Sequence, residues 1–148
     1  MNIPRAPLIL GLAGLIPFAL GGITAIYGEA AMARAIGIHI LLQYGTVILA
    51  FMSGVLWGFA AKDQGWNLGY ALSTLPALWA FFATLADAPM RLLALSLGFV
   101  VLLGLDWQFQ RRALAPEWWL RLRLILTVGV LICLGLGGFR LINPMLGL

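Results

Sequence analysis

The stretch from residue 37 to residue 61 contains no Lys, Arg, Asp or Glu, and it limits the possible folds more than any other feature. Roughly 20 apolar residues in a helix suffice to cross a bilayer, so this stretch can form a membrane-spanning helix. In the whole chain 63% of residues are hydrophobic and 9% are charged, against about 25% charged in a typical soluble domain. A soluble protein of 148 residues could not bury so much apolar surface, which indicates a membrane protein.

Further apolar runs lie on both sides of this stretch, separated by short polar connections. We predict a single all-α transmembrane domain, 1–148, that forms a polytopic membrane helix bundle of about five helices. The expected spans are about 6–27, 37–61, 66–86, 90–107 and 119–141. Pro17 and Pro76 lie inside two of these spans and predict kinks, because proline cannot donate a backbone hydrogen bond.

Small residues recur at every fourth position in two of the spans. These stripes comprise Thr46, Ala50, Gly54 and Gly58 in the central span and Ala13, Pro17, Gly21 and Ala25 in the first. Small residues let two backbones approach closely, which is how helices pack in lipid. We therefore interpret both stripes as helix-packing faces and place the 37–61 span at the centre of the bundle.

A polar face adjoins the central stripe and consists of His39, Gln43, Tyr44 and Ser53. Because polar groups in a bilayer need partners, we interpret this face as a source of hydrogen bonds between helices, with a substrate path as the alternative. His39 is the single histidine and a candidate for a haem or quinone contact. A bis-histidine haem within one chain is impossible, and an interfacial histidine that bonds water or headgroups is the simpler interpretation.

Asp106 closes the fourth predicted span, and acidic residues in membrane spans are often functional. We place it at the cytoplasmic edge and expect interfacial pairing with basic residues, the alternative being a proton relay. The predicted pairing set is Asp106, Arg111, Arg112, Arg121 and Arg123, in which Arg111 or Arg112 can reach the carboxylate and one of the last two meets Asp106 or Glu117.

The basic residues lie at the ends of the apolar runs. Six of them, Arg5, Lys62, Arg111, Arg112, Arg121 and Arg123, share one side, and three, Arg34, Arg91 and Arg140, share the other. The positive-inside rule then predicts a cytoplasmic N-terminus and a periplasmic C-terminus. The net charge of +4 is explained by anionic headgroups, and no soluble domain is present to bind nucleic acid.

No sequence motif points to an enzyme. The chain has no phosphate-binding loop of the Gly-x-x-x-x-Gly-Lys-Ser type, no His-Glu-x-x-His motif and no paired catalytic carboxylates. Its single cysteine, Cys133, excludes an intramolecular disulfide and a cysteine-rich metal site. We expect no catalytic residues, no metal and no cofactor apart from bound lipid.

Several short motifs resemble those of a known family. They are Tyr44-x-x-x-Ile48-Leu49-x-Phe51, Gly54-x-x-Trp57-Gly58, Pro76-Ala-Leu-x-Ala80, Leu97-Gly98-Phe99, Asp106, Pro116-x-Trp118 and Leu122-Arg123-x-x-Leu126-Thr127. Together they resemble a family of small bacterial inner-membrane proteins of unknown function, related to mitochondrial transmembrane protein 69. The resemblance implies a bacterial inner-membrane protein with about five spans and no particular reaction.

The leading functional hypothesis is a non-enzymatic accessory or assembly subunit that packs on a larger membrane complex through its small-residue faces. A respiratory or photosynthetic complex is a reasonable class of partner, and self-association would satisfy the same faces. The alternative is a small transporter or channel for a neutral solute or lipid, which would use the polar residues Gln43, Tyr44, Thr46, Ser53 and Thr74.

Overall fold

A computed structural model describes residues 2–63 and 65–143, and every regular element within them is an α-helix. In chain order these are α1 (Arg5–Ala13), α2 (Ile16–Tyr27), α3 (Ala31–Ala60), α4 (Asn67–Ala83), α5 (Ala88–Arg111) and α6 (Trp119–Ile142). Residues 1, 64 and 144–148 of the predicted domain lie outside the described part of the chain.

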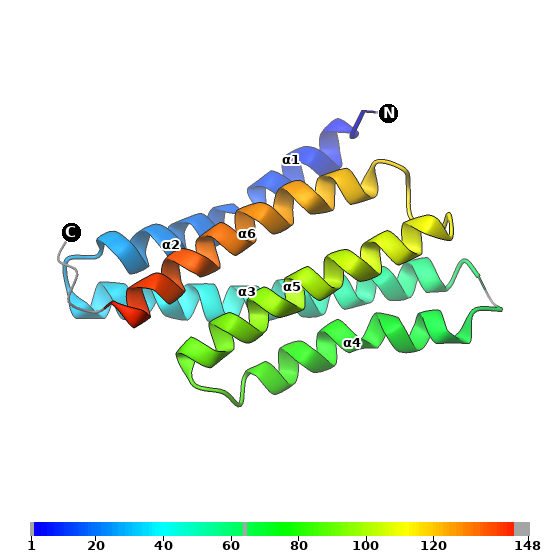
Figure 1. Ribbon diagram of the computed structural model, residues 1–148. Helices are drawn as coiled ribbons and strands as arrows, with labels where there is room; N and C mark the ends of the chain where they lie inside the picture. Colours follow the sequence, from blue (N-terminus) through cyan, green and yellow to red (C-terminus); the bar gives the residue numbers. More distant parts are fainter. Residues whose placement is uncertain (1, 64, 144–148) are drawn as a thin grey trace.

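The helices run side by side in alternating directions, with α1 and α2 forming one interrupted segment (Figure 1). One end of the bundle contains the start of α1, the last residues of α3 and α5, and the start of α6. We call it the proximal end. The opposite end, where α2 turns into α3 and α6 finishes, is the distal end. Because they stand at or near the helix ends, Arg5, Lys62 and Arg112 share the proximal end, while Arg34, Arg91 and Arg140 share the distal end.

Four segments of this bundle are long and apolar enough to cross a membrane. They are Arg5–Tyr27, Ala31–Ala60, Ala88–Arg111 and Trp119–Ile142. Helix α4 has 17 residues, continues through Pro76 and packs against α3 and α5. These observations confirm the predicted polytopic all-α membrane bundle.

Helix α3 contacts α2, α4, α5 and α6, which confirms its central place in the bundle. It begins at Ala31, six residues before Gly37, where the second span was predicted to begin. Most of the connection expected between the spans 6–27 and 37–61 is therefore helical, and that part of the prediction was wrong. The Arg34 guanidinium explains why the turn is so short. It donates hydrogen bonds to the carbonyl oxygens of Gly28 and Glu29, at 3.0 and 3.1 Å, and so ties the start of α3 to the end of α2.

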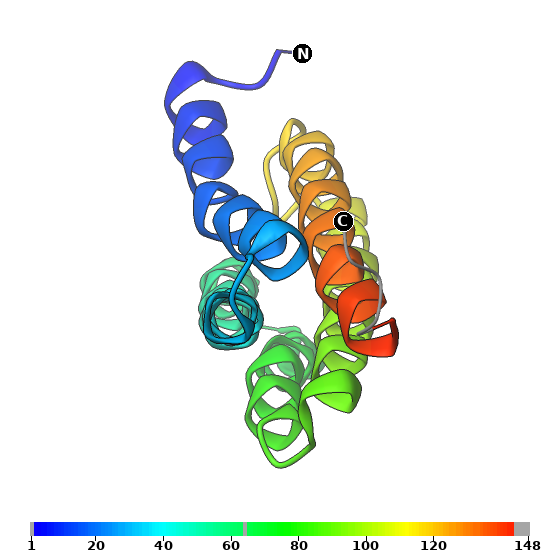
Figure 2. The same cartoon turned by 90° about the vertical axis from the view of Figure 1, so that its left-hand side faces the viewer.

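The first predicted span is broken where Pro17 predicted an interruption. Helix α1 ends at Ala13, and α2 begins at Ile16 with Pro17 in its first turn, where a missing amide proton leaves no hydrogen bond unmade. Beyond the break α1 leans away from α3 toward the proximal end (Figure 2). This divergence leaves room for side chains between α1, α3 and α6.

The distal end is closed by backbone contact between α2 and α3. A Cβ added at Gly37 would lie 2.7 Å from the Gly21 carbonyl oxygen and 2.9 Å from the Ala25 Cα atom. Gly21 and Ala25 belong to the predicted small-residue stripe of the first span and are both buried, whereas Ala13 is exposed. The packing role of this stripe is therefore confirmed at its second half only.

Candidate ligand-binding cavity beside a buried ion pair

The proximal end of the bundle contains an ion pair between α5 and α6. Arg123 Nε donates to Asp106 Oδ2 at 2.8 Å, and the two side chains are 5% and 0% exposed. The Trp119 indole nitrogen donates to the other carboxylate oxygen, Oδ1, at 2.7 Å. Both carboxylate oxygens therefore have a donor, as a buried charge requires.

A hydrogen-bonded connection sets the start of α6 against the end of α5. The Gln110 amide group accepts from the Leu120 backbone nitrogen at 3.2 Å and donates to the Glu117 carbonyl oxygen at 3.0 Å. Lys62, at the end of α3, donates to the Leu114 carbonyl oxygen at 2.9 Å. These contacts place Trp119 and the next turn of α6 opposite Asp106.

The α5 helix ends in a left-handed residue that is not glycine. Ala113 has a φ of 56°, and the Leu114 amide donates back to the Phe109 carbonyl oxygen at 3.1 Å. This is the pattern of a helix C-terminus in which the following apolar residue packs on the last turn, and Leu114 is buried. The turn reverses the chain within a few residues and so determines where α6 begins.

Two polar atoms near the ion pair have no hydrogen-bond partner. They are Arg123 Nη2 and Thr127 Oγ1, both fully buried within the described residues. Arg123 and Thr127 are 4% and 3% exposed and stand one helical turn apart on the same face of α6. A buried donor or hydroxyl without a partner is rare in folded proteins, because its desolvation is not offset.

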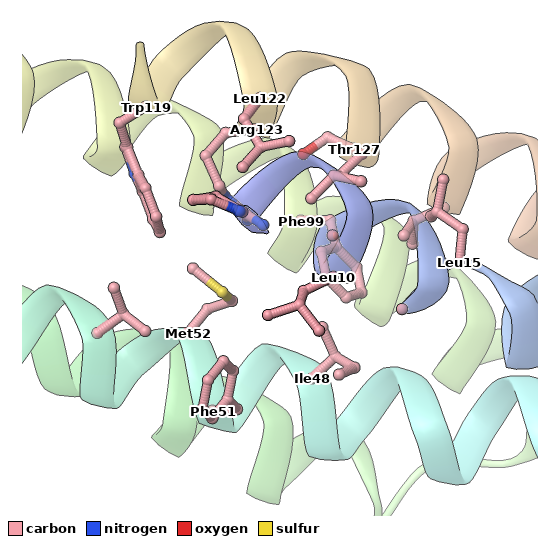
Figure 3. Close-up of a pocket in the computed structure, with 16 residues that line it drawn as sticks. Leu10, Leu15, Ile48, Phe51, Met52, Phe99, Trp119, Leu122, Arg123 and Thr127 are labelled. Carbon is pink, nitrogen blue, oxygen red and sulfur yellow. The ribbon is translucent and has the colours of Figure 1, made fainter. Parts of the chain in front are cut away.

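Both side chains line a cavity of about 380 Å³ between α1, α3, α5 and α6. Its walls are otherwise apolar and include Leu10, Leu15, Met52 and Phe99, and Trp119 lies beside it (Figure 3). Figure 3 shows the Arg123 guanidinium extending from α6 into the space between α6 and α3. Leu10 on α1 and Phe51 on α3 line the same cavity and are 72% and 64% exposed, so the cavity opens between these two helices on the outside of the bundle.

A second cavity of about 560 Å³ lies between α4 and α5 and has a different lining. It is lined by apolar side chains such as Leu75, Phe82 and Val101, together with Trp79. The Trp79 indole nitrogen already donates to the Ala94 carbonyl oxygen at 2.7 Å. No unpartnered buried atom of the described residues belongs to this lining.

The predicted pairing set around Asp106 needs correction. Asp106 is fully buried inside the bundle, and its partner is Arg123, which confirms the prediction that one of Arg121 and Arg123 meets Asp106 or Glu117. Arg111 and Arg112 do not bind it: their guanidinium groups lie over the rings of Trp107 and Trp66, at 4.8 and 4.1 Å from the ring centroids. Arg121 is exposed on the opposite side of α6 from the pair.

The predicted stripe on α3 does not form a contact within the chain at its glycines. A Cβ at Gly54 or at Gly58 would meet no atom within 4 Å, and both residues are exposed. Thr46 and Ala50 are half-buried, and the Thr46 hydroxyl donates to the Leu42 carbonyl oxygen at 2.7 Å. The close helix approach on α3 is at Gly37 instead.

The predicted polar face of α3 has no common environment. His39 and Gln43 are exposed, and Tyr44 is half-buried against Phe18, with 5.0 Å between ring centroids. Ser53 is buried and donates its hydroxyl proton to the Ser73 carbonyl oxygen of α4, as expected for a hydrogen bond between helices. These four residues do not line a continuous path.

Arg91, which was expected at the membrane surface, forms hydrogen bonds with α3 beside this polar face. The Arg91 guanidinium of α5 donates to Thr46 Oγ1 at 3.0 Å, to the Leu42 carbonyl oxygen at 3.3 Å and to Gln43 Oε1 at 3.5 Å. Its Nε atom is buried without a partner. Arg91 therefore connects α5 to α3 through neutral acceptors, whereas Arg123 is paired with a carboxylate.

Sequence reasoning did not identify Trp119, Thr127 or the cavity. One signal was available: Arg123 and Thr127 stand four residues apart inside an apolar run, which places both on one face of a helix. A charge on such a face needs a partner from another helix. The sequence left Asp106 and Glu117 as alternatives for this partner, and the packing of α5 against α6 selects Asp106.

Comparison with known proteins assigns the chain to a family. The family model described as "Protein of unknown function (DUF3429)" matches residues 3–139. Transmembrane protein 69 of Xenopus tropicalis is 37% identical over 136 residues, which cover 84% of this chain and 50% of the relative, so the chain spans about half the length of that curated protein. No solved structure matches the chain. The chain, an integral membrane protein by its apolar helices and this relative, belongs to the DUF3429 family.

Proposed function

We propose that the protein is a non-enzymatic accessory or assembly subunit that packs on a larger membrane complex through the outward face of α3. The observation that carries this proposal is the open space beside Gly54 and Gly58, where an added Cβ would meet nothing of the chain within 4 Å. A glycine face in lipid favours close approach of another helix, and the chain itself uses Gly37 in this way. A second copy of the chain would satisfy the same face.

The test is the composition of the complex that the tagged protein forms. The full-length chain is purified from its native membranes in mild detergent and analysed by native gel and mass spectrometry. We expect stoichiometric co-purification with one larger complex and loss of it in the Gly54→Leu and Gly58→Leu variants. Gly104→Leu is the matched control, because Gly104 is also exposed with nothing within 4 Å but lies on α5.

The outcomes separate the alternatives. A homo-oligomer that dissociates in Gly54→Leu would assign the face to self-association. A wild-type monomer, or a complex retained equally in Gly54→Leu and Gly104→Leu, would contradict the proposal.

The proposed location is the bacterial inner membrane, with a cytoplasmic N-terminus and a periplasmic C-terminus. The support is the distribution of exposed basic residues, since Arg5, Lys62, Arg111, Arg112 and Arg121 gather at the proximal end. Arg123 leaves this group because it is buried against Asp106. Reporter fusions active on only one side of the membrane, placed at each terminus, would test the orientation; a periplasmic N-terminal signal would contradict it.

A further inference from the structure

We propose that the cavity between α1, α3 and α6 binds a lipid-soluble molecule with an apolar body and a neutral carbonyl oxygen, which accepts hydrogen bonds from Arg123 and Thr127. The donors of this site lie on α6, so it does not depend on the α3 face of the proposed function, but its opening at Phe51 borders that face, three residues from Gly54. The argument rests on three properties of the cavity: its unpartnered donors, its charge balance and its opening.

The first property is a pair of fixed and unused donors. Arg123 Nε is held by Asp106 at 2.8 Å, and Asp106 is held in turn by Trp119 at 2.7 Å, so the guanidinium group cannot easily turn away. Its Nη2 atom and the Thr127 hydroxyl have no partner among the described residues, and both residues line the cavity. An acceptor oxygen on a ligand in the cavity would supply the partner that these groups lack. A single water could do the same, but it would leave most of the 380 Å³ unfilled.

The second property is charge. Among the residues that the structure describes, Arg123 is the only ionisable one in the lining, and its charge is already balanced by Asp106. A carboxylate ligand would add an unbalanced negative charge in a site of low dielectric, which is unfavourable. A neutral acceptor, such as the carbonyl oxygen of a quinone or of a glycerolipid ester, forms the hydrogen bonds without this penalty. The bound molecule therefore has a carbonyl head and no net charge at that end.

The third property is the shape of the cavity. Its volume is near the lower limit of the roughly 300–1,000 Å³ that is usual for small-molecule sites. This space holds a head group and the first part of a tail. The exposed Leu10 and Phe51 flank the opening between α1 and α3, through which the rest of an acyl or isoprenoid chain reaches the lipid.

The test uses the purified full-length protein and native mass spectrometry from detergent micelles. The probes are a benzoquinone with a decyl tail, a diacyl phosphatidylglycerol, methyl palmitate and palmitate. We expect one retained adduct per chain with a neutral carbonyl probe, and stronger retention of methyl palmitate than of palmitate. Whether the quinone or the diacyl lipid is retained more strongly identifies the source of the carbonyl group.

Two variants with matched controls test the site itself. Thr127→Val keeps the shape and the ion pair, and we expect roughly three- to ten-fold weaker retention, as for one lost hydrogen bond. Val55→Phe fills the cavity from α3, and we expect retention to fall at least ten-fold. Thr74→Val on α4, whose hydroxyl bonds its own helix, and Val101→Phe, in the second cavity, should stay within two-fold of the wild type.

A purely structural role for Thr127 predicts a different result. Removing an unpartnered buried hydroxyl should leave the unliganded protein as stable or more stable, so a loss of retention in Thr127→Val cannot be attributed to unfolding. Equal retention in the wild type, Thr127→Val and Val55→Phe would overturn the proposal. Palmitate retained more strongly than its methyl ester would overturn the neutral-carbonyl assignment.

Discussion

At the distal end, α2 and α3 approach so closely that a Cβ at Gly37 would lie 2.7 Å from the Gly21 carbonyl oxygen. At the proximal end, α1 diverges from α3 and leaves a cavity beside the pair of Asp106 and Arg123. The first end is held by backbone contact together with the hydrogen bonds of Arg34, and the second by an ion pair and hydrogen bonds from a few side chains. Close packing leaves no room for a ligand between α2 and α3 at Gly37, whereas the polar side chains of the proximal end support α1 and α6 at a distance and leave a cavity between them.

The largest expected effect is at the proximal ion pair. Asp106→Leu leaves the buried Arg123 guanidinium without its partner, and we expect the free energy of unfolding to fall by about 3–5 kcal/mol. Unfolding in mixed micelles with increasing dodecyl sulfate measures this change. The double variant Asp106→Leu/Arg123→Met removes both charges and should recover most of the loss.

That double variant is also the control. If it were as unstable as Asp106→Leu, the loss would come from packing around α5 and not from an unpaired charge. The proposed contrast between a charge-held end and a backbone-held end would then be wrong.

The next effect concerns the distal end. Gly37→Ala places a Cβ against the backbone of α2 and should lower the free energy of unfolding by about 1–3 kcal/mol, the range for overpacking. Gly58→Ala, on the same helix but with open space around it, should raise stability slightly because alanine favours the helix. Equal effects at both positions in the unfolding assay would contradict the close approach.

Arg91 tests whether an arginine bound to neutral acceptors near the middle of α3 contributes less to stability than one paired with a carboxylate. Arg91→Met removes donors to Thr46 and to the Leu42 carbonyl oxygen, but that carbonyl keeps the Thr46 hydroxyl as a partner. We expect a loss of about 1 kcal/mol, typical of a net hydrogen bond and well below that of Asp106→Leu. A loss above about 3 kcal/mol would show that both arginines act in the same way.

The smallest expected effect is at the turn after α5. Ala113 adopts a left-handed conformation with a φ of 56°, which glycine accepts without strain. We expect Ala113→Gly to raise the free energy of unfolding by about 0.5–1 kcal/mol, because relief of strain exceeds the added freedom of the unfolded chain. Ala61→Gly is the control: Ala61 has a φ of −63°, so the same change should lower stability.

Features set by local chemistry could be predicted from the sequence. The break near Pro17, the all-helical membrane bundle and the buried Gly21 and Ala25 follow from proline geometry, hydrophobic length and small-residue spacing, although about five spans were predicted and four segments are long and apolar enough to cross a membrane. Features that depend on which helix faces meet could not be predicted from the sequence. The four-residue spacing is the same at Gly21 and at Gly54, yet only Gly21 meets a neighbour within the chain.

The partner of Asp106 is another feature that the sequence alone did not determine. The sequence places Asp106 near several arginines, and the nearest in sequence, Arg111 and Arg112, were expected to reach it. Their guanidinium groups lie over the rings of the exposed Trp107 and the buried Trp66, while Arg123, further along the chain, reaches the carboxylate through the packing of α5 against α6. The partner was therefore decided by tertiary geometry and not by sequence distance.

The pair between α5 and α6 also has a consequence for biogenesis. Each helix alone brings one charged residue into its apolar span, for which insertion scales assign about 2.5–3.5 kcal/mol at the centre of a span; Asp106 and Arg123 stand nearer the ends of α5 and α6, where the cost is lower. Once the turn at Ala113 forms, the two charges neutralise each other before either meets hydrocarbon. We predict that the two helices enter the membrane as a hairpin; a chain truncated after residue 118 that integrates α5 as efficiently as the full chain would disprove it.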